Sequence, residues 1–222
     1  MPEMIRRLGR LVTEQVHRIR ERRRREWIDR LCRNGMKLGN NVVIMQNVIF
    51  DVDYPWLIEI EDGCRISSNT RIMAHDATAF RDLGVTRIGR VRILRDSFIG
   101  ENTIILPGVT IGPRAMVAAG SVVGRDIGEG VLAAGNPARV YGQYDEFLAR
   151  IRTAATGGFI VPVDGIRDPA QIELIRAAMD RGEQVFVRDA EDDDLSNYHN
   201  ITRDDVHRAA RDSFARNFGD CA

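Results

Sequence analysis

The stretch that decides the fold runs from residue 93 to residue 128 and divides into blocks of six: ILRDSF, IGENTI, ILPGVT, IGPRAM, VAAGSV and VGRDIG. Every block begins with a β-branched aliphatic residue, and the fifth residue is small in all but the last block. A helix at 3.6 residues per turn would rotate such a repeat off any single face, and a long strand would not break for a turn every six residues. A fixed six-residue period is instead typical of a parallel β-helix, in which very short strands alternate with tight turns.

Three blocks would make one coil of a triangular prism, with one block on each side. We expect the first residues of the blocks to stack along the axis of the prism; these are Ile93, Ile99, Ile105, Ile111, Val117 and Val123. Each coil in such a stack contacts only its neighbours. A polar residue at Ile105 or Ile111 should therefore weaken two interfaces at once.

The repeat begins near Leu38 and is interrupted twice. Residues 51–59 (DVDYPWLIE) break the six-residue phase, and Pro55 disfavours a regular strand there. The phase resumes at Ile60 and is lost again over residues 75–87, a segment too long for a corner, which we expect to leave the prism as a loop. Loops held by a rigid scaffold commonly carry functional residues.

The two flanks of the repeat have different compositions. Residues 3–33 carry apolar side chains at spacings of three and four and predict a helix. In residues 143–222, Asp168 and Pro169 predict the start of a helix that Gly182 ends, residues 184–187 predict a short strand, and Thr202 opens a further helix. The sequence thus predicts a basic N-terminal helix (1–35), a β-helix domain (36–142) and a mainly helical C-terminal extension (143–222).

The charge balance gives no general argument for nucleic acid as a partner, because 32 Lys and Arg residues face 32 Asp and Glu residues. Residues 1–35 nevertheless carry eleven arginines. The run from Arg22 to Arg25 is interpreted as a solvated helix face, as a contact with anionic membrane lipids or as a docking site for an acidic partner. The three cysteines form no CxxC motif, which favours reduced thiols and a cytoplasmic location.

These blocks, together with AGNPAR at residues 134–139, resemble the hexapeptide-repeat acyltransferases, and among them the sugar and polysaccharide O-acetyltransferases. The resemblance implies a left-handed parallel β-helix, which is an exception to the usual right-handed crossover. It also implies acetyl-CoA as co-substrate, no required metal, and a homotrimer with the cofactor in the groove between neighbouring subunits.

Transfer of an acyl group to a hydroxyl needs a base, and histidine is the usual one near neutral pH. Of the four histidines, His17, His75, His199 and His207, only His75 lies in the repeat region, where the loop begins. The family places its catalytic histidine at such a junction, so His75 is the predicted catalytic base, and the role of Asp76 is left open. A zinc site of the γ-carbonic anhydrase kind needs three histidines, which the repeats do not supply.

The resemblance also implies contacts for the cofactor and the acceptor. Two arginines would suit the phosphates of CoA, and small residues would let its pantetheine approach the backbone. The implied cofactor residues are Glu101, Ala119, Gly120, Arg125 and Arg139. Asn47, seven residues before Tyr54, matches a substrate-contacting asparagine of the sugar acetyltransferases, although Asn at a corner is also a common turn former. Phe98 stands where the family often has Trp, and Gly124 where it often has Thr.

The predicted function is therefore acetyl-CoA-dependent O-acetylation of a sugar hydroxyl, on a cell-surface polysaccharide or its precursor. The aromatic residues Tyr54 and Trp56 favour a ring-shaped acceptor, although they are also interpreted as packing for the interrupted coil. Three alternatives stay open: a serine or xenobiotic acetyltransferase, an amino-sugar N-acetyltransferase, and a non-catalytic trimeric scaffold.

Overall fold

The computed structural model describes residues 2–162 and 168–188. The helix expected from Thr202, together with His199 and His207, lies outside the described residues. Within the described residues, 2–141 form one compact unit, and 142–162 with 168–188 belong to another. The two units are taken in turn.

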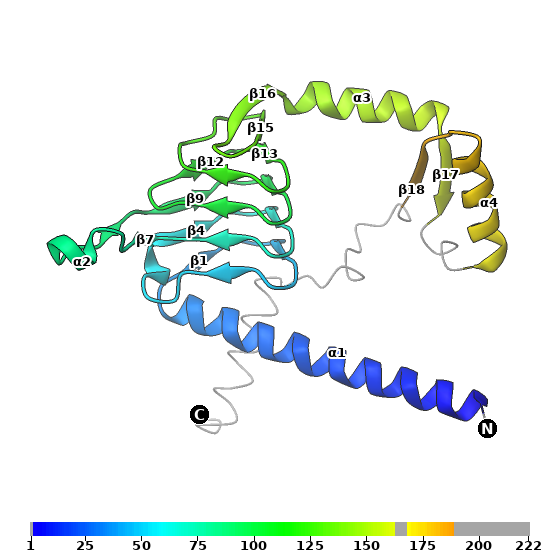
Figure 1. Ribbon diagram of the computed structural model, residues 1–222, viewed down its shortest axis with the longest axis horizontal. Helices are drawn as coiled ribbons and strands as arrows, with labels where there is room; N and C mark the ends of the chain where they lie inside the picture. The colour runs from blue at the N-terminus through cyan, green and yellow to red at the C-terminus, as the bar shows by residue number, and fades with distance from the viewer. Residues whose placement is uncertain (1, 163–167, 189–222) are drawn as a thin grey trace, which may run out of the picture. The chain divides into compact units, whose positions relative to one another are not determined.

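Three sheets form the sides of a prism (Figure 1). The chain visits them in the same order in each coil, and parallel pairing between coils builds the stack. The first side holds β1 (Lys37–Leu38), β4 (Ile58–Ile60), β9 (Val91–Ile93) and β12 (Thr110–Ile111). The second side holds β2 (Val43–Ile44), β5 (Arg65–Ile66), β10 (Phe98–Ile99), β13 (Met116–Val117), β15 (Val131–Ala134) and β16 (Arg139–Gln143). The third side holds β3 (Ile49–Phe50), β6 (Arg71–Ile72), β11 (Ile104–Ile105) and β14 (Val122–Val123). This part of the chain is the parallel β-helix that the six-residue period predicts.

The core of the prism is a column of inward-pointing aliphatic side chains. Ile105 lies between Ile72 and Val123 in the ladder of the third side, and all three are at most 1% exposed. The six block-initial residues from Ile93 to Val123 are all 0% exposed. Each such side chain contributes roughly 1.5–3 kcal/mol through burial, so the column provides the main stabilisation of the stack.

The corners of the prism explain the composition of the repeat. The fourth residue of most blocks has a positive φ, which Asn, Asp and Gly adopt with little strain. Examples are Asn47, Asn69 and Asn102, with φ between 57° and 61°. The small fifth residues are buried, and Thr103 satisfies its hydroxyl by donating to the Gly100 carbonyl at 2.7 Å.

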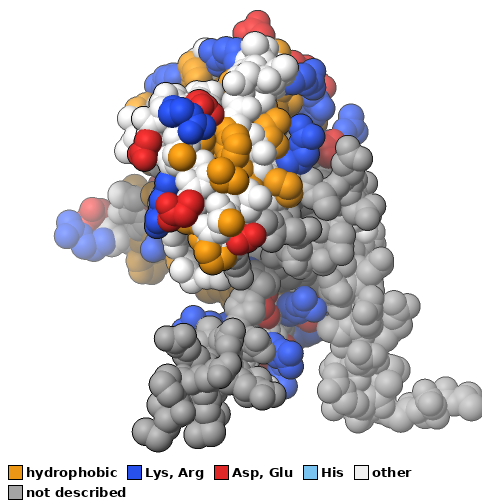
Figure 2. All heavy atoms as spheres, turned by 90° about the vertical axis from the view of Figure 1, so that its right-hand side faces the viewer, with side chains coloured by type: hydrophobic (Ala, Val, Ile, Leu, Met, Phe, Trp, Pro, Cys, Tyr) orange, Lys and Arg blue, Asp and Glu red, His pale blue; other side chains and the backbone are white. Residues whose placement is uncertain are grey.

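The outward-pointing residues differ from side to side. The first side is charged or polar, and Arg92 Nε lies 3.3 Å from Glu59 Oε2 on the neighbouring strand. The third side is apolar at Ile49, Ile104 and Val122 and carries an arginine at β6. Seen from the right-hand side of Figure 1, the molecule has hydrophobic side chains in the middle of the visible face and charged side chains around them, and this face is not one side of the prism (Figure 2).

Helix α1 (Pro2–Arg33) covers the open end of the first coil with its C-terminal part. Ile28 and Leu31 are buried in the same core as the inward residues of the prism, and the Trp27 ring lies 5.6 Å from that of Phe50. Arg24 Nη1 donates to the Ile44 carbonyl at 2.8 Å. The Arg22–Arg25 run is therefore not a uniform solvated face, because Arg24 is largely buried against the first coil.

The two interruptions of the repeat both lie at the corner between the third and first sides. Residues 51–57 replace one corner and contain the 3₁₀ helix η1 (Pro55–Leu57). Residues 75–88 form an arm that stands off the prism (Figure 1). In the arm, β7 (His75–Asp76) pairs antiparallel with β8 (Arg87–Ile88), and α2 (Phe80–Leu83) lies between them. The segment expected as a loop is thus an arm with secondary structure of its own.

The second unit contains strands as well as helices, whereas the sequence predicts a mainly helical extension. It comprises α3 (Tyr144–Gly157), β17 (Phe159–Pro162), α4 (Pro169–Asp180) and β18 (Val185–Arg188). β17 and β18 pair in parallel, and Asp168 accepts a hydrogen bond from the Ala170 N–H at the start of α4, where the sequence predicts a cap. None of the described helices combines the length and the hydropathy that crossing a bilayer requires.

The two residues of β11 provide a matched test of the column. Ile105→Ala should lower the free energy of unfolding by about 2–4 kcal/mol because it leaves a cavity between two coils. Ile104→Ala, on the outward-pointing neighbour, should cost clearly less. Urea unfolding of both variants measures this difference, and equal losses would contradict an inward column at the first position.

Candidate active site

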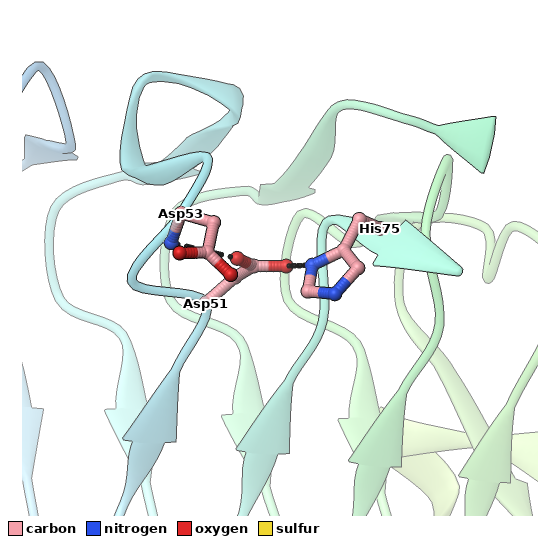
Figure 3. Close-up of side chains that lie close together, drawn as sticks. All are labelled: Asp51, Asp53 and His75. Carbon is pink, nitrogen blue, oxygen red and sulfur yellow. Dashed lines mark hydrogen bonds and ion pairs between the residues drawn. The ribbon is translucent and has the colours of Figure 1, made fainter. Parts of the chain in front are cut away.

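Parallel stacking brings His75 and Asp51 together at one corner of the prism. Asp51 follows β3 and His75 follows β6, and these two strands pair with Phe50 opposite Ile72. Residues that leave the two strands therefore lie one above the other. His75 Nδ1 is 2.5 Å from Asp51 Oδ2 (Figure 3). The sequence predicts His75 but not this partner.

Asp51 is held by the backbone on both of its oxygens. The N–H of Ala74 donates to Oδ2 at 2.9 Å, and the N–H groups of Asp53 and Tyr54 donate to Oδ1 at 3.1 and 3.2 Å. The side chain is 2% exposed. Burial alone would raise the pKa of this carboxyl, but the hydrogen bonds from Ala74, His75 and Tyr54 outweigh burial and lower the pKa below its ordinary value. Asp51 is therefore a fixed, ionised acceptor.

An ionised Asp51 determines which nitrogen of His75 carries the proton. The carboxylate accepts only, so a neutral imidazole donates from Nδ1 and keeps the lone pair on Nε2. Figure 3 shows Nε2 turned away from Asp51. The His75 side chain is 30% exposed, and the Tyr54 ring lies 5.3 Å from it. The arrangement presents an oriented base to a group arriving from outside the prism.

Asp51, Asp53 and His75 also offer atoms within 4.8 Å of one another, which is close enough for a cation. The donors are already engaged, however. Nδ1 contacts Asp51 Oδ2 directly, and both Asp51 oxygens accept backbone N–H groups. The geometry is thus that of a hydrogen-bonded Asp–His dyad with its carboxylate committed to donors, and it fits a bound metal poorly.

Five of the six remaining predicted residues lie on two edges of the prism, and the sixth, Arg139, lies in β16. Asn47, Glu101, Ala119 and Gly120 stack along the corner between the second and third sides, where the Gly120 N–H donates to the Glu101 carbonyl at 2.7 Å. On that corner Asn47 Nδ2 donates to Asn69 Oδ1 at 3.3 Å, and Asn69 Nδ2 donates to Glu101 Oε1 at 3.2 Å.

Arg125 lies on the other edge, in the turn after β14, at the same corner of the prism as His75. Arg139 opens β16 and donates from Nη1 to the Ala138 carbonyl at 2.9 Å. Within one chain, the third side therefore separates His75 from the implied pantetheine contacts. Asp76, whose role the sequence leaves open, accepts hydrogen bonds from the N–H and the hydroxyl of Thr78 and so caps the first turn of the arm.

One feature of the sequence points to Asp51: the six-residue phase breaks at that residue. Such a break marks a corner that is not a standard tight turn and whose residues are candidates for another role. Identifying the partner of His75 needed the register between β3 and β6, which pairs residues 22 positions apart and is set by the intervening corner lengths.

The lowered pKa of Asp51 predicts how its contribution to stability depends on pH. A carboxyl whose pKa is lower in the folded protein stabilises the fold fully above its unfolded value, about 3.9, and this contribution is lost as the pH falls through the folded value. The difference in free energy of unfolding between the parent protein and Asp51→Asn should therefore shrink as the pH is lowered from about 5 towards 2. Urea titrations at several pH values measure it. A difference that stays constant over this range would show that Asp51 is not an ionised acceptor in the fold.

Comparison of the chain with known proteins identifies the family to which it belongs. The model described as "Bacterial transferase hexapeptide (six repeats)" matches residues 90–125. "Putative acetyltransferase YvoF" of Bacillus subtilis (strain 168) is 36% identical over 120 residues, which cover 54% of this chain and 67% of that protein. The "dTDP-3-amino-3,6-dideoxy-alpha-D-galactopyranose 3-N-acetyltransferase" of Aneurinibacillus thermoaerophilus is 44% identical over 64 residues, 29% of this chain and 33% of that protein. The crystal structure of a maltose O-acetyltransferase from Clostridium difficile 630 aligns with a TM-score of 0.44 at 24% identity, over 56% of this chain and 87% of that one. The chain belongs to the hexapeptide-repeat acyltransferase family.

Proposed function

We propose that this protein is an acetyl-CoA-dependent O-acetyltransferase that acts on a sugar hydroxyl, with His75 as its general base. The observation that carries the proposal is the Asp51–His75 dyad, whose Nε2 points away from Asp51 and makes no hydrogen bond within the described part of the chain. Membership of an acyltransferase family indicates that the proton taken by this base is lost during acyl transfer. A left-handed sense for the coil is part of the same proposal.

The mechanism follows from the dyad. Nε2 of His75 accepts the proton of the acceptor hydroxyl as its oxygen attacks the thioester carbonyl of acetyl-CoA. The carbon–sulfur bond then breaks, and the same proton passes to the CoA sulfur as the thiol leaves. Asp51 stays ionised throughout, stabilises the transient imidazolium and prevents the ring from turning. The transfer is direct, with no acyl group held on the protein.

A homotrimer is the proposed assembly, with the cofactor groove shared by two subunits. The apolar third side, at Ile49, Ile104 and Val122, and the apolar residues of the arm support it. Phe80 is 61% exposed and Leu83 is 72% exposed, and burial against a neighbouring subunit would remove these side chains from water. The implied cofactor residues Glu101, Ala119 and Gly120 of one subunit would then face the corner of the next that carries His75 and Arg125, and Arg139 would complete the shared groove.

The acceptor is proposed to be a sugar of a cell-surface polysaccharide or its precursor, with Asn47 as a contact. A second candidate is the amino group of an amino sugar, because the relative from Aneurinibacillus thermoaerophilus is named a 3-N-acetyltransferase of such a sugar nucleotide. The same dyad would take a proton from an ammonium or amine. The free thiols Cys32 and Cys64 suit the proposed cytoplasmic location, and the exposed arginines of α1 would suit anionic lipid headgroups.

Removing either member of the dyad should lower turnover. His75→Ala should reduce kcat about 10²–10⁴-fold, the usual range for a general base, with little change in the KM for acetyl-CoA. Asp51→Asn should cause a loss in the same range of about 10²–10⁴-fold, because the amide N–H₂ favours the tautomer that carries its proton on Nε2. The measurement is CoA release with glucose, galactose, N-acetylglucosamine, glucosamine and serine as acceptors, corrected for hydrolysis.

The control is Asp76→Asn, which alters the neighbouring exposed carboxylate and should leave kcat nearly unchanged. A His75→Ala protein that retains its turnover would remove His75 from the mechanism and favour the scaffold alternative. A preference for serine would contradict the sugar assignment, and a preference for glucosamine would favour the amino-sugar candidate.

A shared site predicts complementation between two inactive variants. Ala119→Trp should block the proposed cofactor-binding surface at the corner that carries Glu101, Ala119 and Gly120. His75→Ala removes the base. When equal amounts are unfolded together and refolded into mixed trimers, about one quarter of the sites should combine an intact cofactor-binding surface with an intact base from the neighbour. Activity assays after sedimentation of the mixture measure this. A mixture that stays inactive, although both proteins are trimeric, would place the whole site within one chain.

A further inference from the structure

Besides Tyr54 and His75, the corner that carries the dyad has a third aromatic residue, Trp56. Trp56 is part of η1 in the segment that interrupts the first coil, and its side chain is 55% exposed. It is therefore not packing for the interrupted coil, in contrast to Tyr54, which is partly buried against the core. An exposed indole beside a reaction centre is a large rigid apolar surface available to a ligand.

The backbone holds Trp56 in place. Pro55 is buried and fixes the start of η1, and the Leu57 N–H donates to the Tyr54 carbonyl at 3.0 Å. Gly35 lies directly against Trp56, because a Cβ added at Gly35 would be 2.8 Å from the Trp56 Cβ. The indole therefore projects from a turn that is fixed on both sides.

Two ring contacts connect Trp56 to the base. The Trp56 and Tyr54 rings meet edge to face with centroids 5.5 Å apart, and the Tyr54 and His75 rings lie 5.3 Å apart. The carboxylate of Asp53 is exposed and lies within 4.8 Å of the Asp51 and His75 ligand atoms. The corner thus presents an apolar ring face, a hydrogen-bond acceptor and the proposed base, with the Tyr54 ring in contact with both the indole and the imidazole.

This combination suits a pyranose. The C–H face of a sugar ring is apolar and stacks on indole, while its hydroxyls donate to carboxylates. Serine and other small acceptors have no ring to use such a surface. We propose that Trp56 is the platform on which the acceptor's pyranose ring stacks, so that a ring hydroxyl reaches Nε2 of His75 while Asp53 accepts from a neighbouring hydroxyl. This inference rests on the proposed function and names the residue that selects for sugars.

The kinetic test compares Trp56→Ala and Trp56→Phe with Val52→Ala, a change at another exposed side chain of the same segment (59% exposed). Trp56→Ala should raise the KM for glucose, galactose and N-acetylglucosamine about tenfold, which corresponds to ~1.4 kcal/mol of lost stacking. Trp56→Phe should recover most of this loss, and Val52→Ala should cause none. The KM for acetyl-CoA and the slow acetylation of glycerol, which has no ring, should not change.

A binding test needs no turnover, because the chain has two tryptophans. In Trp27→Phe, Trp56 is the sole reporter, and its fluorescence should shift to shorter wavelength and saturate with the same sugars. In Trp56→Phe, the remaining Trp27 should show no such change.

The outcomes separate the two claims. If the parent protein acetylates sugars but Trp56→Ala leaves their KM unchanged, or slows glycerol equally, the platform is wrong and the proposed function stands. The platform is also wrong if Trp56→Ala changes the sedimentation of the protein, since the indole would then serve assembly. If the parent protein acetylates none of the sugars, the proposed function fails and the platform fails with it.

Discussion

The structure depends on coils that stack in register, so that each inward aliphatic residue lies directly on its counterpart in the next coil. Ile72, Ile105 and Val123 are one such row. The register requires corners of fixed length, which the left-handed conformation of Asn69, Asn102 and their equivalents provides. Wherever a corner is longer, the extra residues must leave the prism. Both departures occur at the same corner, and the dyad forms where they begin.

The stacking also explains why the dyad is rigid. A buried carboxylate is costly unless hydrogen bonds satisfy it. Asp51 receives them from its own corner, at Asp53 and Tyr54, and from the next coil, at Ala74 and His75. The charge that orients the imidazole therefore also ties two coils together. The stability of this corner and the orientation of the His75 imidazole therefore have the same source.

Much of the fold could be predicted from the sequence because its interactions are local and periodic. The six-residue spacing identifies the inward column, and Asp168, Pro169 and Gly182 mark the ends of α4. The position of His75 at the start of the second interruption could also be predicted. The roles of Glu101, Ala119, Gly120, Arg125, Arg139 and Asn47 depend on a neighbouring subunit and stay predictions.

Features set by tertiary contacts could not be predicted in this way. Asp51 becomes the partner of His75 only through the pairing of β3 with β6. The burial of Arg24 depends on how α1 lies across the first coil, which a helical pattern does not specify. The parallel pairing of β17 with β18 joins segments on either side of α4 and follows no period in the sequence.

The position of the dyad within the stack has a consequence for how such a protein can change in length. Asp51 and His75 belong to the first two coils, and α1 covers the end beside them. Coils at the opposite end contact only their neighbours. A gene could therefore gain or lose a whole coil beyond β12 without altering the geometry of the Asp51–His75 dyad. Inserting or deleting a single residue between β3 and β6 would shift the Asp51 carboxylate out of reach of His75. The same scaffold is thus tolerant of duplication at one end and intolerant of small insertions at the other.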